Sequence, residues 1–323
     1  MRAPGFWARR GSLVSILLTP LGWLHARATA RRVARPGLRL EVPVICVGNL
    51  TAGGAGKTPT VMWLAPQIPG VHILSRGYGG SLRGPVRVDP NTHGADQVGD
   101  EPLLLSAFAP TWVAKDRMAG AQAARAAGAS AILMDDGFQD PALAKDLSIV
   151  VVDAETGFGN GRVIPAGPLR EPIAAGLARA DIVLTIGPGD TQARLSLPDH
   201  IQHLCGRLAP LATGMPWADL PVFAFAGIGR PEKFFDTLRD LGVDLKDSEA
   251  LADHQPLTST LLKRLGDRAA ALSAQPVTTE KDAVRLPPSL RGRVLILPVR
   301  LEVEDDAPLR AALDTLLSGK GPA

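Results

Sequence analysis

Residues 42–60 read VPVICVGNLTAGGAGKTPT, and this stretch decides the fold. The run VPVICV is apolar and mostly β-branched, which is typical of a strand buried on both faces. A glycine-rich turn follows and ends in Gly-Lys-Thr, and TPTVMWLA then begins like a helix. A strand, a glycine-rich loop and a helix in this order predict a phosphate-binding P-loop. Thr51 is a departure, because the general motif has its first glycine there.

The loop residues have separate roles in such a motif. Backbone N–H groups surround the phosphates, the lysine reaches the β- and γ-phosphates, and the hydroxyl after it binds Mg²⁺. Lys57 and Thr58 occupy these last two positions. We therefore predict ATP and Mg²⁺ as cofactors, with a glycine-rich turn of no function as the alternative. The predicted nucleotide-binding residues are Thr51, Ala52, Gly53, Gly54, Ala55, Gly56, Lys57 and Thr58.

Short apolar runs recur between residues 42 and 187, namely VPVICV, VHILS, AILMDD, LSIVVVD and DIVLTIG. Such runs, separated by helical stretches such as RMAGAQAARAAGA, are typical of a parallel sheet with crossover helices. The segment PLATGMPWADLP, residues 210–221, is rich in proline and glycine and reads as a hinge. We predict an α/β fold: a P-loop NTPase-like, mostly parallel sheet flanked by helices over 41–209, and a second, smaller α/β domain over 222–323.

Charge is distributed unevenly along the chain. The formal net charge is +3, yet the first 40 residues hold eight arginines and no acid, so the remaining 27 basic and 32 acidic residues sum to about −5. This pattern argues against a nucleic-acid surface spread over the folded body. The two cysteines, Cys46 and Cys205, fit neither a metal site nor a disulfide framework.

Residues 1–40 form a basic, apolar N-terminal segment. Its uncharged run GSLVSILLTPLGWL, residues 11–24, is shorter than a spanning helix and contains Pro20. A secretory signal and a buried core helix are alternatives. We favour a helix lying at a membrane surface, with Leu17, Leu18, Leu21, Trp23 and Leu24 in the acyl boundary and the arginines near anionic headgroups.

Acidic residues follow two of the apolar runs and open one helix. Asp135 and Asp136 end a predicted strand, where a P-loop enzyme places the acid that holds its metal. Asp153 ends another strand, and its alternative role is to cap the next helix. Asp100 and Glu101 in GDEP either cap a helix or act in catalysis, Asp100 as a base and Glu101 near the metal.

Basic candidates come from two glycine- or proline-rich segments, SRGYGG and GNGRVIPAGPLREP, and from one helix start. Arg76, Arg117, Arg162 and Arg170 are candidates to neutralise transition-state charge, although most arginines on a surface have no specific role. His254 in LADHQPL could orient a carboxylate, and a lone histidine is often purely structural.

The full set of motifs resembles the tetraacyldisaccharide 4′-kinase family. VGNLTAGGAGKTP, SRGYGG, GDEP, DDGFQ, GNGRVIPAGPLREP, ADH and TTEKDAV occur in this order over nearly the whole chain. The resemblance implies transfer of the ATP γ-phosphate to the 4′-hydroxyl of tetraacyldisaccharide 1-phosphate, giving lipid IVA. It also implies a peripheral enzyme at the cytoplasmic face of the inner membrane, with no nucleic acid and no obligate protein partner.

The same resemblance implies roles for individual residues. Asp100 would be the base, assisted by His254. Catalysis would also use Lys57 and Arg170, and Arg117 would face the phosphates. The residues implied near the metal are Thr58, Glu101, Asp135 and Asp136.

A membrane-associated P-loop ATPase switch of the partitioning or site-selection type is the competing prediction. Such proteins carry an early second lysine in a KGGxGKT loop, and Ala52 stands at that position. A nucleotide-binding scaffold without catalysis is a further alternative, and it would leave the acids of GDEP and DDGFQ unexplained.

Overall fold

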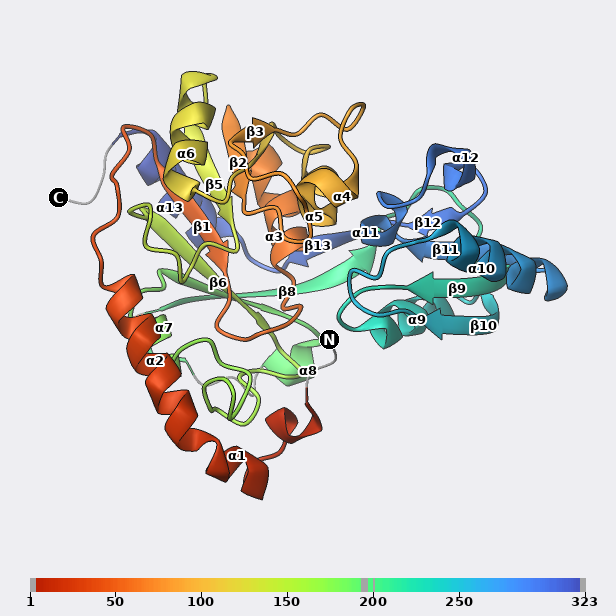
Figure 1. Cartoon of the computed structure of the whole chain (residues 1–323), viewed down its shortest axis with the longest axis horizontal. Coiled ribbons are helices and arrows are strands. Elements are labelled where there is room, and N and C mark those ends of the chain that lie inside the picture. Colours follow the sequence, from red (N-terminus) through yellow and green to blue (C-terminus); the bar gives the residue numbers. More distant parts are fainter. Residues whose placement is uncertain (1–3, 193–196, 200, 320–323) are drawn as a thin grey trace.

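A nine-stranded sheet forms the larger unit of the chain, in a computed structural model that describes residues 4–192, 197–199 and 201–319 (Figure 1). The strand order is β13-β8-β7-β6-β1-β5-β2-β4-β3, and the pairs from β8 to β4 are parallel. Antiparallel strands β3 and β13 form the two edges. The strands are β1 (Val44–Gly48), β2 (Val71–Ser75), β3 (Val86–Arg87), β4 (Thr111–Val113), β5 (Ala131–Asp135), β6 (Leu147–Asp153), β7 (Ile182–Ile186), β8 (Gln202–Pro210) and β13 (Val299–Val303).

Helices cover both faces of this sheet, as its apolar strands require. One core lies under α3 (Lys57–Leu64), α5 (Asp100–Leu105) and α13 (Ala307–Leu317), and the other lies under α6 (Arg117–Ala126) and α7 (Ile173–Leu177). The five apolar runs of the sequence become β1, β2, β5, β6 and β7, so the predicted fold class is confirmed. The short elements are η2 (Ala65–Gln67), α4 (Ala95–Val98) and α8 (Gly189–Gln192).

The smaller unit is a four-stranded parallel sheet with the order β10-β9-β11-β12. Its strands are β9 (Pro221–Ala226), β10 (Asp244–Ala250), β11 (Gln275–Thr279) and β12 (Leu295–Leu297). Its helices are α9 (Pro231–Asp240), α10 (Ser259–Ala271), α11 (Glu280–Ala283) and α12 (Pro288–Arg291). Apolar side chains of α9 and α10 pack on opposite faces of β9, which gives this unit a core of its own.

The end of the chain differs from the predicted division at 222–323. The run VLILPVRLEV is split at Pro298: β12 pairs inside the smaller sheet, whereas β13 pairs antiparallel with β8 in the larger one. Leu309 and Leu313 of α13 then pack in the core of the larger unit. Because proline has no N–H for a strand ladder, Pro298 is a natural point for the chain to leave one sheet for the other. Two connections therefore join the units, residues 211–220 and Pro298.

The N-terminal segment forms η1 (Gly5–Ala8), α1 (Leu13–Leu17) and α2 (Thr19–Val33), which lie along one side of the larger unit (Figure 1). The face turned toward the protein is polar or small: Ser15, Gly22 and Thr29 are buried, and the Ser15 hydroxyl donates to the Ala166 carbonyl at 2.6 Å. Apolar side chains point outward, with Leu17 79% and Trp23 74% exposed. This exposure contradicts the alternative of a buried core helix. Among the described residues, every helix is too short or too polar to cross a bilayer.

Candidate active site

The P-loop connects β1 to α3 and is shaped by two contacts. Gly56 is the residue before α3 and has φ 95°, and a Cβ placed on it would lie 2.6 Å from Cδ1 of Ile186. Thr51 forms a β-bridge with Leu169, and the N–H of Ala52 donates to the Pro168 carbonyl at 2.7 Å. Thr51 therefore lies in an extended part of the loop, where the backbone conformation does not require a glycine. The segment PAGPLRE is thereby joined to the P-loop.

Lys57 and Arg170 converge on Asp136. The Arg170 guanidinium binds both carboxylate oxygens of Asp136, at 2.8 and 3.2 Å, and Lys57 Nζ lies 3.7 Å from the same carboxylate. Burial would raise the pKa of Asp136, but the charges of Lys57 and Arg170 outweigh it and hold the pKa below its usual value. Asp136 is therefore a carboxylate, and it holds the two cations at the wall of the cavity.

Asp135 is different from its neighbour. Its side chain is buried, and burial, followed by the charges of Glu101 and Asp136, raises its pKa to about 7. One oxygen accepts from Ser75 Oγ at 3.2 Å, whereas Oδ1 is buried without a hydrogen-bond partner. A buried polar atom without a partner costs stability, so its presence suggests a ligand that satisfies it. A metal-bound water or a cation suits an oxygen of this kind.

Asp100 and His254 meet across the boundary between the two units. Asp100 is the first residue of α5, and Gly99, with φ 91°, precedes it as the N-cap. The carboxylate lies 2.9 Å from His254 Nδ1, and its Oδ1 accepts the N–H of Glu101. The main-chain position that caps α5 is thus Gly99, and the Asp100 side chain is turned toward the histidine. His254 itself has φ 58° and packs edge-on against Tyr78.

Lys281 is a site residue that the sequence indicated only as part of the string TTEKDAV. Its ammonium lies 3.0 Å from Glu101 Oε1, 3.3 Å from His254 Nε2 and 3.7 Å from Asp253 Oδ1. Burial would lower the pKa of Lys281, but the surrounding carboxylates raise it, so the side chain is charged. Lys281 therefore links the smaller unit to the acids that open α5.

Three of the predicted arginines have other surroundings. Arg117 lines the cavity, but it is largely buried and its guanidinium donates to the carbonyls of Leu74, Asp135 and Asp136; its role toward the phosphates stays a prediction. It thus fixes the strand ends that carry the acids. Arg162 donates to Thr19 Oγ1 and so holds α2 in place. Arg76 is exposed at the cavity wall.

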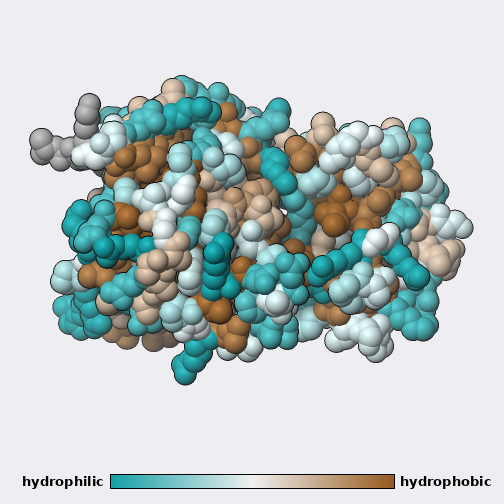
Figure 2. Space-filling model, turned by 90° about the horizontal axis from the view of Figure 1, so that it is seen from above, coloured by the Kyte–Doolittle hydropathy of each residue, from teal (hydrophilic) through white to brown (hydrophobic). Residues whose placement is uncertain are grey.

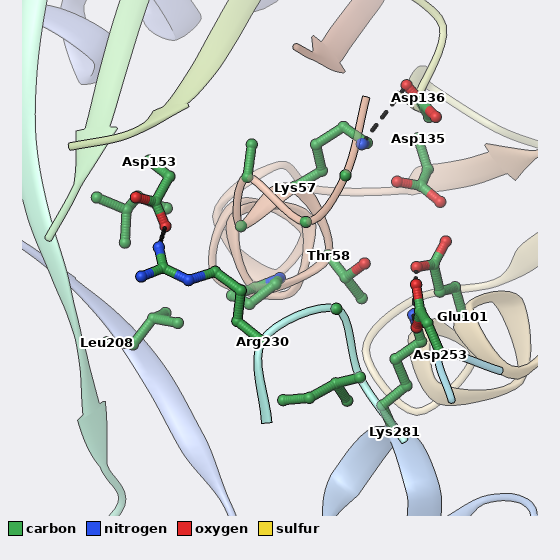
Figure 3. A pocket seen from close by; sticks show the side chains of 18 of the residues that line it. Lys57, Thr58, Glu101, Asp135, Asp136, Asp153, Leu208, Arg230, Asp253 and Lys281 are labelled. Carbon is green, nitrogen blue, oxygen red and sulfur yellow. Dashed lines mark hydrogen bonds and ion pairs between the residues drawn. The ribbon is translucent and has the colours of Figure 1, made fainter. Parts of the chain in front are cut away.

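A single cavity of about 1350 Å³ brings these groups together between the two units. Seen from above, the outline of the molecule narrows where the units meet (Figure 2). Figure 3 shows Lys57, Asp135, Asp136 and Glu101 from the larger unit facing Lys281 and Asp253 from the smaller one, around the start of α3. All the predicted P-loop residues except Thr51 line this cavity, as do His254 and Arg170.

A P-loop with paired acids and a facing carboxylate–histidine pair is the arrangement expected of an ATP-dependent phosphotransferase. A family model described as tetraacyldisaccharide-1-P 4′-kinase matches residues 14–318. The chain belongs to this family and is accordingly an ATP-dependent kinase of lipid A biosynthesis, which confirms the resemblance in its motifs.

Relatives and a solved structure support this assignment over the full length. The tetraacyldisaccharide 4′-kinase of Dinoroseobacter shibae is 62% identical over 98% of this chain and 98% of that protein. That of Rhodospirillum rubrum is 50% identical over the whole of both chains. The "apo" form of LpxK from Aquifex aeolicus in complex with ATP has a TM-score of 0.79 at 25% identity, covering 94% of this chain and all of that one.

Proposed function

We propose that this chain transfers the γ-phosphate of ATP to the 4′-hydroxyl of tetraacyldisaccharide 1-phosphate, with Asp100 as the base. One observation carries the proposal: His254, which pairs with the buried Asp100, lines the same cavity as Lys57, Asp135 and Asp136. A nucleotide on the P-loop and an alcohol beside Asp100 would share that cavity. The family name supplies the identity of the alcohol.

ATP would lie on the P-loop, with Lys57 and Arg170 near its terminal phosphates. Both cations are held by Asp136, so they are fixed before the nucleotide arrives. Prior positioning matters because phosphoryl transfer depends mainly on orientation and charge neutralisation.

Mg²⁺ fits the acids that surround Thr58. Among the described residues, no three metal-ligating side chains already converge on one point. This agrees with magnesium sites in kinases, where one or two carboxylates and the phosphates themselves supply the ligands. Thr58, Asp135, Asp136 and Glu101 are the residues that would hold the ion, and the unpartnered Oδ1 of Asp135 favours such a role. When bound, Mg²⁺ would neutralise charge on the β- and γ-phosphates.

Asp100 suits a base that orients the hydroxyl and accepts its proton late. Burial would raise the pKa of Asp100, but the hydrogen bond from His254 and the charges of Lys281 and Arg285 lower it. A carboxylate with a lowered pKa removes protons poorly in the ground state. It is adequate for phosphoryl transfer, in which the nucleophile gains acidity only as its bond to phosphorus forms.

The enzyme would work at the cytoplasmic face of the inner membrane as a peripheral protein. The substrate carries four acyl chains and stays in a bilayer, so the active site has to reach its surface. The exposed apolar side chains of α1 and α2, together with nearby arginines, support this placement.

The test is transfer of labelled γ-phosphate to purified tetraacyldisaccharide 1-phosphate in detergent micelles. We expect a phosphorylated lipid from the wild-type chain and none above background from Lys57→Ala, because the lysine neutralises the transferred group. Release of free phosphate alone by the wild type would instead support an ATPase switch. Ala52 argues against that second function, because such switches carry a lysine at this position.

A further inference from the structure

A second group of ion pairs joins the two units away from His254. It consists of Asp153 and Glu155 after β6, and Arg230 and Lys233 at the start of α9; we call it the Asp153 cluster. Arg230 Nη1 lies 2.7 Å from Asp153 Oδ2, and Arg230 Nη2 lies 2.7 Å from Glu155 Oε2. Lys233 Nζ lies 2.8 Å from the same Asp153 oxygen and 2.6 Å from Glu155 Oε2. Each cation therefore contacts both acids.

This cluster flanks the P-loop on the side opposite Asp135. In the sheet, β6 and β5 are the two neighbours of β1, so their carboxyl ends lie on either side of the loop that follows β1. Figure 3 shows Arg230 beside the start of α3 with its guanidinium at Asp153, while Lys281 lies near Glu101 on the other side. Between them, the backbone of Gly229 approaches Gly54, since a Cβ on Gly229 would lie 3.6 Å from Gly54 N.

The cluster is better placed than an ordinary surface ion pair. Asp153 is only 11% exposed at its side chain, and its Oδ1 accepts the N–H groups of Glu155 and Thr156, which fix the carboxylate. Burial would raise the pKa of Asp153, but the hydrogen bond and charge of Lys233 and the charge of Arg230 outweigh it and lower the pKa. Networks of partly buried charges stabilise more than single exposed pairs, which contribute little.

Only two short connections join the units covalently, residues 211–220 and Pro298. Non-covalent contacts therefore decide how firmly the smaller unit rests on the P-loop. One set of these contacts, His254 with Asp100 and Lys281 with Glu101, belongs to the proposed chemistry. The Asp153 cluster is a further set, beside the ion pair of Glu280 with Arg300 next to Pro298, and it holds no residue to which the proposed reaction gives a role.

We propose that the Asp153 cluster is an electrostatic latch that holds the smaller unit over the P-loop, with Arg230 and Lys233 as positioning residues for the kinase reaction. The proposal rests on the proposed function, because it takes the P-loop as the ATP site. When the latch is weakened, a smaller fraction of molecules is closed before ATP binds. The apparent Kd for ATP rises by the inverse of that fraction. Saturating ATP restores closure, so kcat changes little.

The experiment compares neutral variants of the full-length protein. Lys233→Gln and Glu155→Gln should each raise the Kd of a fluorescent ATP analogue roughly 3- to 5-fold, in line with a reduced closed fraction. The KM for ATP should rise in parallel, with kcat for the lipid within about twofold of wild type. Lys233→Arg should behave like wild type. The matched control is Arg239→Gln, because Arg239 is on the same helix and pairs with Asp236 of that helix.

The double variant decides whether the two residues act through each other. Glu155 and Lys233 are in contact, so Glu155→Gln with Lys233→Gln should raise the Kd by less than the product of the single effects. Salt should raise the Kd of the wild type more than that of the double variant. Single variants with the Kd of wild type, or a double variant equal to the product, would overturn the latch. If the wild type binds ATP but does not phosphorylate the lipid, the proposed function fails, and the binding series still tests the latch.

Discussion

The carboxylate of Asp100 lies 2.9 Å from Nδ1 of His254, and the two residues come from different units of the chain. Asp100 opens α5 in the larger unit, and His254 follows β10 in the smaller one. Their contact depends on how the units sit together. A shift of the smaller unit relative to the larger one would therefore change the distance between the two side chains.

The first prediction concerns Asp100 and His254 as a functional pair. Asp100→Asn should lower kcat about 10²- to 10⁴-fold, the usual contribution of a general base, and leave the Kd for ATP within about twofold of wild type. His254→Asn should lower kcat less, since it removes only the partner of the base. The double variant should be no worse than Asp100→Asn alone, because residues that act as a unit are not additive. Steady-state kinetics with the lipid substrate checks this. An unchanged kcat in Asp100→Asn would return Asp100 to a structural role at the start of α5.

The second prediction is a pH dependence of stability that comes from the same contact. The hydrogen bond with Asp100 raises the pKa of His254 above 6.5, although burial opposes the shift. A group whose pKa is higher in the folded than in the unfolded protein stabilises the fold fully at pH values below its unfolded-state pKa. This stabilisation is lost as the pH rises through its folded-state pKa. The pKa of Asp100 is lowered, so its effect on stability has the opposite pH dependence. Asp100 stabilises the fold at pH values above its ordinary pKa of 3.8, and this stabilisation is lost at more acidic pH.

The pair should therefore stabilise the protein most between about pH 4 and 6.5. In thermal melts with EDTA, the Tm difference between wild type and His254→Asn should be larger at pH 6 than at pH 9. Arg239→Gln, which changes a pair inside α9, should show no such trend between these pH values. A difference that grows toward pH 9 would mean that neutral His254 is the favoured form.

Local patterns of the sequence were enough for much of the fold. The runs that became β1, β2, β5, β6 and β7 consist mainly of apolar residues, so their burial on both faces could be predicted from composition. The assignment of VLILPVRLEV to the smaller domain was wrong for its second half, because the two halves of this run enter different sheets. A local sequence pattern does not show which strand will be its partner. Pro298 was the available signal for a break.

The candidate site was predicted unevenly for a similar reason. Lys57, Asp135 and Asp136 lie at or after the carboxyl ends of predicted parallel strands, so their position at the same end of the sheet can be inferred from the sequence. The buried position of Arg117 depends on carbonyls of two strands that are distant in the sequence. The pairing of Lys281 with Glu101 depends on how two units meet, which no spacing encodes. The buried face of α1 and α2 could have been predicted from the sequence, because Ser15, Gly22 and Thr29 recur every seven residues. These three residues form the face that packs on the protein.

The third prediction separates two glycines of the P-loop. Gly56 has φ 95° and no room for a Cβ, since Ile186 is 2.6 Å from that point. Gly56→Ala should lower the free energy of unfolding by about 1–3 kcal/mol through backbone strain and the clash. Gly54 has open space around its Cβ position and a φ outside the left-handed region, so Gly54→Ala should stay within about 0.5 kcal/mol of wild type. Denaturant unfolding without nucleotide measures both. Equal losses would mean that the loop adjusts freely around Gly56.

The fourth prediction tests α1 and α2 as the membrane contact. Leu17 and Trp23 are 79% and 74% exposed, so replacing both with serine should leave the Tm unchanged. Each large apolar side chain that enters the acyl region contributes about 1.5–3 kcal/mol, so the double variant should bind vesicles at least 10-fold more weakly. Sedimentation with vesicles containing phosphatidylglycerol measures this at low and high salt.

Point variants are a sharper test than deletion of the segment, because Ser15 and Thr29 are packed against the protein and their loss would expose its surface. Leu211→Ser is the matched control, since Leu211 is an exposed apolar residue in the connection between the units. It should bind vesicles like wild type. High salt should weaken the binding of the wild type only in part, because the apolar contribution does not depend on screening. Unchanged binding by the Leu17/Trp23 variant would place the membrane contact on another face of the molecule.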